Sequence, residues 1–96
     1  MRFMVTWRVH PEKRHEAFHG FSQMTDADDA ADMGDQIKLI GRWHDLQQFK
    51  GVAICETSDP HALAAWLLNW NNVLDVEAVP VLDDEEARAI GRKKFG

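Results

Sequence analysis

Hydrophobic and polar residues alternate through the first part of the chain, and this pattern predicts a β-strand over Arg2–Val9. Aromatic and β-branched residues recur there at every second position, as they do on one face of a strand. The same periodicity predicts strands over Ile37–His44 and Val73–Leu82. Pro80 marks the latter as an edge strand, because proline donates no ladder hydrogen bond. The segment Gly51–Thr57 is apolar on both faces, which favours a central strand.

Three other segments carry helical signals. A helix is predicted over Pro11–Thr25, since proline suits the first helical turn. Asp59 and Pro60 start a second helix, which ends near Asn71. Its apolar residues fall at helical spacing and form one stripe: Leu63, Trp66, Leu67 and Trp70. A third helix is predicted over Asp83–Lys94, because acidic residues at its start and basic residues at its end complement the helix dipole.

The order of these elements predicts the fold class. Asp26–Gln36 carries five aspartates among small residues and is predicted to be a solvated helix end and loop. The remaining order is βαββαβ with a C-terminal helix, which is the ferredoxin-like α+β arrangement. It implies one domain over residues 1–96, in which helices cover one face of a four-stranded antiparallel sheet. The first and third strands are expected at its centre.

The two faces of this sheet are expected to differ in polarity. The helix-covered face is predicted to carry the more apolar set: Phe3, Val5, Trp7, Leu39 and Trp43. The other face then carries Met4, Thr6, Arg8, Ile40, Arg42 and His44, joined by Asp75 and Glu77. This second face is too apolar for open water and too charged for a core. Such a surface favours contact with a second copy of the chain, and therefore a symmetric homodimer.

Composition narrows the classes of function. The formal net charge is −5, which disfavours a nucleic-acid binder, since such proteins are usually basic. No apolar run is long enough to cross a membrane, and no signal peptide is recognisable. The single cysteine, Cys55, excludes a disulfide within the chain and fits a cytoplasmic location. On a central strand, Cys55 is expected to act as a small buried hydrophobe.

Several stretches resemble a known family: Met1–Trp7, Gly41–His44, Gly51–Glu56, Trp66–Trp70 and Val79–Asp83. They are similar to a small bacterial family of unknown function within the dimeric α+β barrel superfamily. That superfamily includes cofactor-independent monooxygenases, muconolactone isomerase-like enzymes, haem-degrading proteins and ligand-sensing domains. The resemblance implies the dimeric barrel fold and a homodimer, and it supplies no catalytic residues.

Two groups of residues are candidates for a site. Four tryptophans, Trp7, Trp43, Trp66 and Trp70, are predicted either to line a pocket for a small apolar or aromatic ligand or to fill a small core. Arg42 and His44 are the catalytic candidates, the histidine as general base and the arginine as partner of an enolate-like anion. Alternatively, these two side chains pair with acidic residues of either subunit.

Histidines offer a further alternative. His15 and His19 are four residues apart on a predicted helix, so they share a face and suit a metal or haem protein together with His44. Glu16 follows His15, so residues 15–19 read His-Glu-Ala-Phe-His, but a histidine pair at this spacing is a weak signal by itself, and no metal site and no cofactor is predicted. The leading expectation is thus a homodimeric barrel domain that binds a small molecule. A cofactor-independent monooxygenase or isomerase and a metal or haem protein are the alternatives.

Overall fold

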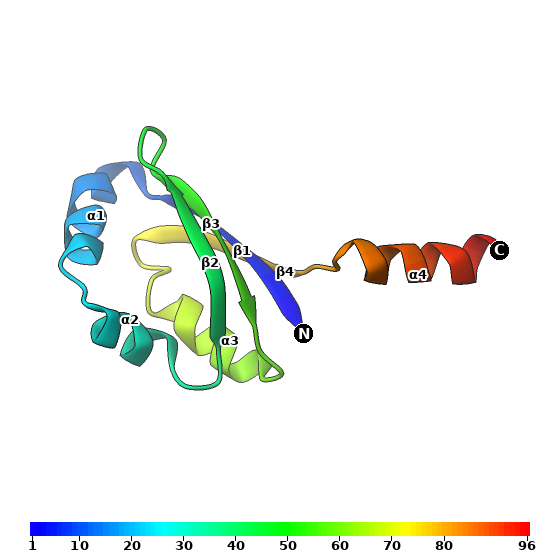
Figure 1. Cartoon of the computed structure of the whole chain (residues 1–96). Coiled ribbons are helices and arrows are strands. Elements are labelled where there is room, and N and C mark those ends of the chain that lie inside the picture. The colour runs from blue at the N-terminus through cyan, green and yellow to red at the C-terminus, as the bar shows by residue number, and fades with distance from the viewer.

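The computed structural model describes residues 1–96 and contains a four-stranded sheet with helices between the strands (Figure 1). The elements follow in the order β1 (Arg2–Val9), the 3-10 turn η1 (Pro11–Lys13), α1 (Arg14–Ser22), α2 (Asp26–Met33), β2 (Lys38–Asp45), β3 (Lys50–Glu56), α3 (Pro60–Leu68), β4 (Leu74–Pro80) and α4 (Asp84–Phe95). The strand order is β2-β3-β1-β4, and all neighbours are antiparallel. This confirms the ferredoxin-like α+β fold, with β1 and β3 at the centre.

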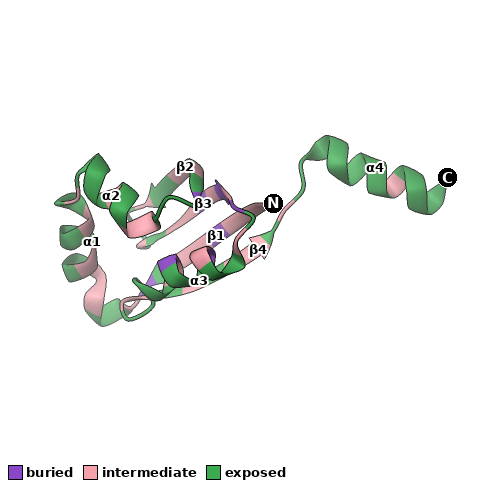
Figure 2. Cartoon of the chain, turned by 90° about the horizontal axis from the view of Figure 1, so that it is seen from below, coloured by how far each residue is buried: buried purple, intermediate pink, exposed green.

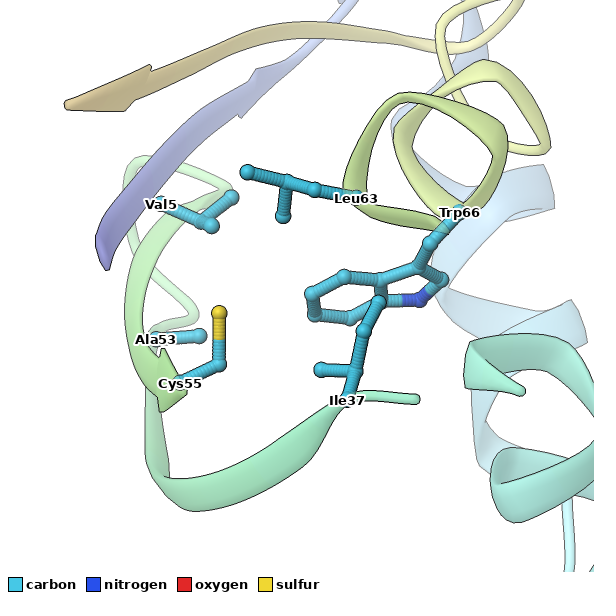
Figure 3. Close-up of a cluster of buried hydrophobic side chains, with 6 residues drawn as sticks. All are labelled: Val5, Ile37, Ala53, Cys55, Leu63 and Trp66. Atoms are coloured by element: carbon cyan, nitrogen blue, oxygen red, sulfur yellow. The ribbon is translucent and has the colours of Figure 1, made fainter. Parts of the chain in front are cut away.

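The hydrophobic core lies between the sheet and α3. Asp59 caps α3 by accepting a hydrogen bond from the backbone N–H of His61, and Pro60 occupies the first turn. Six buried side chains from this helix, the sheet and the residue before β2 pack together (Figure 3): Val5, Ile37, Ala53, Cys55, Leu63 and Trp66. Cys55 is fully buried, which confirms the expectation of a small core hydrophobe, and burial raises the pKa of its thiol.

The segment after α1 corrects the sequence prediction. Residues 26–33 form the helix α2, where a helix end and loop were expected. Thr25 and Asp28 make a reciprocal capping box, and three aspartates in the first turn favour the positive end of the helix dipole. The acidic residues that suggested a loop are therefore N-terminal helix signals. The preceding helix is correspondingly shorter and ends at Ser22.

A β-bulge in β2 corrects the predicted faces of that strand. Leu39 pairs with Cys55 and Gly41 pairs with Ile54, so two steps along β2 match one step along β3. The extra residue, Ile40, inverts the alternation of everything that follows it in the strand. Arg42 and His44 therefore lie on the helix-covered face and Trp43 on the opposite one, the reverse of the prediction from strict parity.

The face of the sheet opposite the helices is uncovered, and we call it the open face. Three residues of β1 lie on this face, and each pairs with a residue of β4: Met4 with Val79, Thr6 with Glu77, and Arg8 with Asp75. As predicted, β4 therefore contributes Asp75 and Glu77 to the open face. Trp43 also lies on this face and is 59% exposed. Helix α4 extends away from the sheet and is exposed along nearly all of its length (Figure 2). None of the helices is both long and apolar enough to span a bilayer.

Candidate functional site

The candidate site is a cavity between the helix-covered face of the sheet and helices α1, α2 and α3. Its volume is about 90 Å³, and 13 of its 19 lining residues are hydrophobic. Aromatic rings from four parts of the chain form much of its wall: Trp7, Phe18, Phe21, Phe49, Trp66 and Trp70. Ligand pockets commonly combine such apolar walls with a few polar groups.

Trp7 forms part of the floor because a glycine stands beneath it. A Cβ atom built at Gly51, the cross-strand partner of Trp7, would lie 2.2 Å from the indole ring. Any side chain at position 51 would therefore push this ring away from the sheet. The absence of a side chain lets the indole lie flat against the strand and leaves the space above it to the cavity.

Asp32 of α2 binds two tryptophans, Trp66 in α3 and Trp70 in the turn that follows α3. Its Oδ2 atom accepts hydrogen bonds from the indole Nε1 of Trp66 at 3.1 Å and of Trp70 at 2.7 Å. Asn69 Nδ2 donates to the Oδ1 atom of the same carboxylate at 3.1 Å. Both indole N–H groups are thus satisfied, and the rings present apolar surface to the cavity. The same bonds tie α2 to α3.

Arg42 spans the cavity wall from β2 to α2. Its guanidinium donates two hydrogen bonds to the carboxylate of Asp29, at 2.8 and 3.2 Å, and both side chains are largely buried. The guanidinium also lies 4.9 Å from the ring centroid of Phe21 on α1. A bidentate pair of this kind satisfies the charge of the arginine inside the protein. The main role of Arg42 in the structure is therefore to link β2 to α2.

His44 stands at the mouth of the cavity between two aromatic rings. Its ring centroid lies 5.4 Å from that of Trp7, edge-on, and 4.9 Å from that of Phe21. Burial lowers the pKa of His44, and the positive charge of Arg42 lowers it further. Both effects favour the neutral form of the imidazole. Because the ring hydrogen-bonds to no other side chain, its nitrogen atoms are left for solvent or a bound molecule.

The structure brings five of the six predicted site residues to this cavity: Trp7, Trp66, Trp70, Arg42 and His44. Trp43 does not reach it. The prediction that Trp43 lines the same pocket is wrong, because the bulge in β2 turns its indole to the open face, where the ring lies over Gly41. A glycine inside a strand is a known sign of a bulge, so Gly41 was the signal that could have corrected the parity.

Sequence reasoning missed several wall residues of the cavity. Asp29 and Asp32 lie in the segment expected to be a loop, so their shared face on a helix was not foreseen. Phe49 was missed because it belongs to the β2–β3 hairpin, where it adopts a left-handed backbone conformation (φ 51°). Phe49 lies beside His15, with 5.6 Å between their ring centroids.

The histidines proposed as metal ligands, His15 and His19 on α1 and His44 on β2, do not form a three-ligand group. No group of three or more His, Cys, Asp or Glu side chains is placed so that it could hold a metal ion. His10 instead bonds to Asp75 at 3.0 Å, while His15 contacts Phe49 and His44 contacts Trp7 and Phe21. This arrangement gives the metal or haem alternative no support.

Comparison with solved structures shows remote similarity. A protein of Streptomyces coelicolor A3(2) is 16% identical over 86% of this chain and all of its own, with a TM-score of 0.49. A Deinococcus radiodurans protein, named as a candidate antibiotic biosynthesis monooxygenase, is 11% identical over 85% of this chain and 92% of its own (TM-score 0.46). An uncharacterised NIPSNAP domain protein of Burkholderia xenovorans is 13% identical over 86% and 95% of the two chains (TM-score 0.46).

Comparison at the level of sequence identifies the family and no activity. A search of curated proteins gives no match to this chain. The model of the DUF3303 family, described as a domain of unknown function, matches residues 1–95. This match covers nearly the whole chain, so the protein belongs to the DUF3303 family.

Proposed function

We propose that residues 1–96 form one dimeric α+β barrel domain, which acts in the cytoplasm and binds a small apolar or aromatic molecule in the cavity. The observation that carries this proposal is the cavity itself, with six aromatic rings in its wall and His44 at its mouth. The single cysteine is unpaired and buried, which suits a reducing compartment.

Most polar groups of the cavity wall are already paired within the protein. Arg42 is neutralised by Asp29, and the carboxylate of Asp32 is occupied by three N–H donors. The imidazole of His44 and the ammonium group of Lys50, which also lines the cavity, bond to no other side chain and are open to a partner. The cavity of about 90 Å³ suits roughly one ring, whereas drug-sized ligands use roughly 300–1,000 Å³. The best-fitting class is a single-ring molecule with one hydrogen-bonding group.

The surface area of the chain supports the homodimer. The accessible surface is 6778 Å², whereas a compact monomer of 11.0 kDa is expected to expose about 5,600 Å². The excess is about 1,200 Å², and standard interfaces bury about 800 Å² on each partner. The mixed polarity of the open face indicates one surface that a second copy would cover.

Ligand binding is tested with fluorobenzene and 4-fluorophenol, followed by ¹⁹F NMR line broadening on titration with protein. Both probes should broaden, and the phenol should broaden more because its hydroxyl can donate to His44. Phe21→Ala removes a ring of the wall and should reduce broadening. Trp43→Ala removes a larger ring outside the cavity and serves as the matched control. Equal loss in both variants, or no broadening by the native protein, would contradict the proposal.

A second candidate function is proton abstraction by His44 without a cofactor. The observation that favours it is the position of His44, which lines the cavity between Trp7 and Phe21 with no side-chain partner for its ring nitrogens. Its lowered pKa favours the unprotonated form that a general base requires. The pairing of Arg42 with Asp29 weakens the predicted role of this arginine toward an enolate, because its donors are already engaged.

This second function is tested by hydrogen exchange at the methyl group of acetophenone in deuterated water. His44 would remove a methyl proton to give the enolate, and return of a deuteron would complete the exchange. The native protein should accelerate the exchange, and His44→Gln should abolish the acceleration. If the fluorinated probes bind but the native protein does not accelerate the exchange, proton abstraction is excluded and ligand binding remains as the function.

A further inference from the structure

Helix α1 is the only helix of the cavity wall that no polar contact joins to the rest of the chain. Every hydrogen bond and ion pair of residues 11–24 is made within residues 10–24. Helix α2 differs, because Asp29 bonds to Arg42 at 2.8 Å and Asp32 accepts hydrogen bonds from two indole N–H groups. Helix α1 also contains no buried residue. Its attachment to the protein is therefore weaker than that of α2.

Phe21 makes the contact between α1 and β2. Its ring centroid lies 4.9 Å from that of His44 and 4.9 Å from the guanidinium of Arg42. Neither contact is a hydrogen bond, so losing them leaves no donor of the sheet unsatisfied. Phe21 also lines the cavity, together with Ala17 and Phe18 of the same helix. Displacing α1 would therefore open this side of the cavity while Arg42 stays bonded to α2.

Phe49 makes the contact between α1 and the β2–β3 hairpin. Its ring centroid lies 5.6 Å from that of His15 and 5.6 Å from the guanidinium of Arg14. The Nε atom of Arg14 is buried and has no hydrogen-bond partner within the protein. A buried donor without an acceptor is unfavourable, and opening α1 would let this atom bind water. The closed position is thus destabilised by a group that opening would satisfy.

Both ends of the α1 segment are anchored. Before it, the backbone N–H of His10 donates to the carbonyl oxygen of Val73 at 2.8 Å, and the imidazole of His10 bonds to Asp75 at 3.0 Å. After it, Thr25 and Asp28 form the capping box that starts α2. A rigid helix that swings outward would disturb these anchors. The segment therefore opens more readily by losing its helical structure between two fixed ends.

The sequence of α1 favours such unwinding. The helix has nine residues, and helices this short depend on packing for most of their stability. Gly20 lies inside it, where glycine is less favourable than alanine. A Cβ atom at position 20 would meet no atom within 4 Å, so the packing does not require a glycine there. Gly20 therefore weakens the helix without serving any contact of it.

We infer that α1 is a lid on the cavity: the segment 11–24 unwinds to let the ligand enter or leave, and the helix forms again over the cavity. This inference rests on the proposed ligand binding and adds the route of entry. Because the helix covers the free and the occupied cavity alike, its stability sets the rates of entry and exit and leaves the affinity unchanged.

The inference is tested with Gly20→Ala in the full-length protein, and Gly91→Ala in α4 is the matched control. At both positions a Cβ atom has open space, so each substitution stabilises its own helix. Gly20→Ala should slow amide hydrogen exchange in α1 about two- to fivefold, the factor that this change brings to a helical equilibrium. Relaxation dispersion of ¹⁹F in 4-fluorophenol should show association and dissociation slowed by the same factor, with an unchanged dissociation constant. Gly91→Ala should leave α1 exchange and both rates at their native values.

Several results would overturn the lid. In the native protein, amides of α1 should exchange faster than those of α2, and equal or slower exchange would contradict the inference. Slower α1 exchange in Gly20→Ala together with native association and dissociation rates would show that the ligand enters elsewhere. Equal slowing of the ligand by Gly20→Ala and Gly91→Ala would show a general effect of stability instead. If the native protein binds no fluorinated probe, the proposed ligand binding itself fails, and the inference with it.

Discussion

The two sides of the helical layer contrast in how they pack on the sheet. Beneath α3, Leu63 and Trp66 are buried against the sheet and complete a cluster of six core side chains. Helices α1 and α2 contain no buried residue, and polar links hold α2 in place through Asp29 and Asp32. The cavity lies where these helices approach the sheet. The α3 side therefore supplies stability, and the α1–α2 side leaves the space in which a ligand can bind.

This division explains why the tryptophans differ in role although their residue type is the same. Trp66 belongs to both sides: its ring enters the core, and its N–H group holds α2. Trp7 and Trp70 are partly buried and line the cavity, whereas Trp43 lies on the open face. The environment of each indole, rather than its chemistry, decides its contribution. Substitutions on each side should separate stability from binding.

The largest expected effect is that of Trp66→Ala. The ring is 6% exposed, and removing a core tryptophan typically costs about 3–5 kcal/mol of unfolding free energy. Urea denaturation measures the change. The same substitution at Trp43, 59% exposed, is the matched control and should cost about 1 kcal/mol or less. Similar shifts at both positions would show that the α3 side is not the stabilising core.

Asp32→Ala should have the next largest effect. It leaves two indole N–H groups without their acceptor, and an unsatisfied partly buried donor costs about 1–3 kcal/mol. Because the lost bonds join α2 to α3, amide hydrogen exchange should accelerate in α2 more than in β1 or β3. Uniform acceleration over the whole chain would contradict the idea that α2 is held separately.

Phe18→Ala should scarcely change stability while it weakens binding. Phe18 is 37% exposed on α1 and lines the cavity, so its loss should cost about 0.5 kcal/mol or less in urea denaturation. The ¹⁹F broadening of 4-fluorophenol should nevertheless decrease. If stability falls as far as in Trp66→Ala, then α1 belongs to the core and the two sides do not differ.

The smallest expected effect is the pH dependence contributed by His44. Its pKa is lowered in the folded state, so the unfolded chain binds more protons at mildly acidic pH. The unfolding free energy should therefore decline as pH falls from about 6.5, the ordinary histidine value, through the folded pKa, and lose no more below it. His44→Gln should remove this part of the decline in urea titrations. An identical pH dependence in both proteins would indicate that His44 is not shielded by the cavity.

The sequence predicted the fold well where local signals and packing agree. Alternation in β1, the Asp59–Pro60 start of α3 and the apolar stripe containing Trp66 each pointed to the element that forms. Pro80 correctly marked β4 as an edge strand. In these segments, the periodicity that buries one face also determines the local structure.

The site was less predictable because it depends on departures from regular patterns. Asp29 and Asp32 share one helical face only if residues 26–33 form a helix, and the aspartates that cap that helix also resemble a loop. Arg42 and His44 reach the cavity because of one unpaired residue in β2. Neither feature follows from average periodicity, since each depends on hydrogen bonds between particular neighbours.

The bulge at Ile40 makes the chemistry of the cavity depend on the pairing register of β2. If Ile40 paired with Ile54 in place of Gly41, every later residue would slip by one position, and Trp43 would turn inward while Arg42 and His44 turned outward. A polar cavity wall and an indole-covered sheet face would then exchange places without any change in composition. Deleting Ile40 would not have this effect, because the pairs from Gly41 onward would keep their present partners. A gap at position 40 in a related sequence should therefore be treated as a change in strand length that keeps the binding surface.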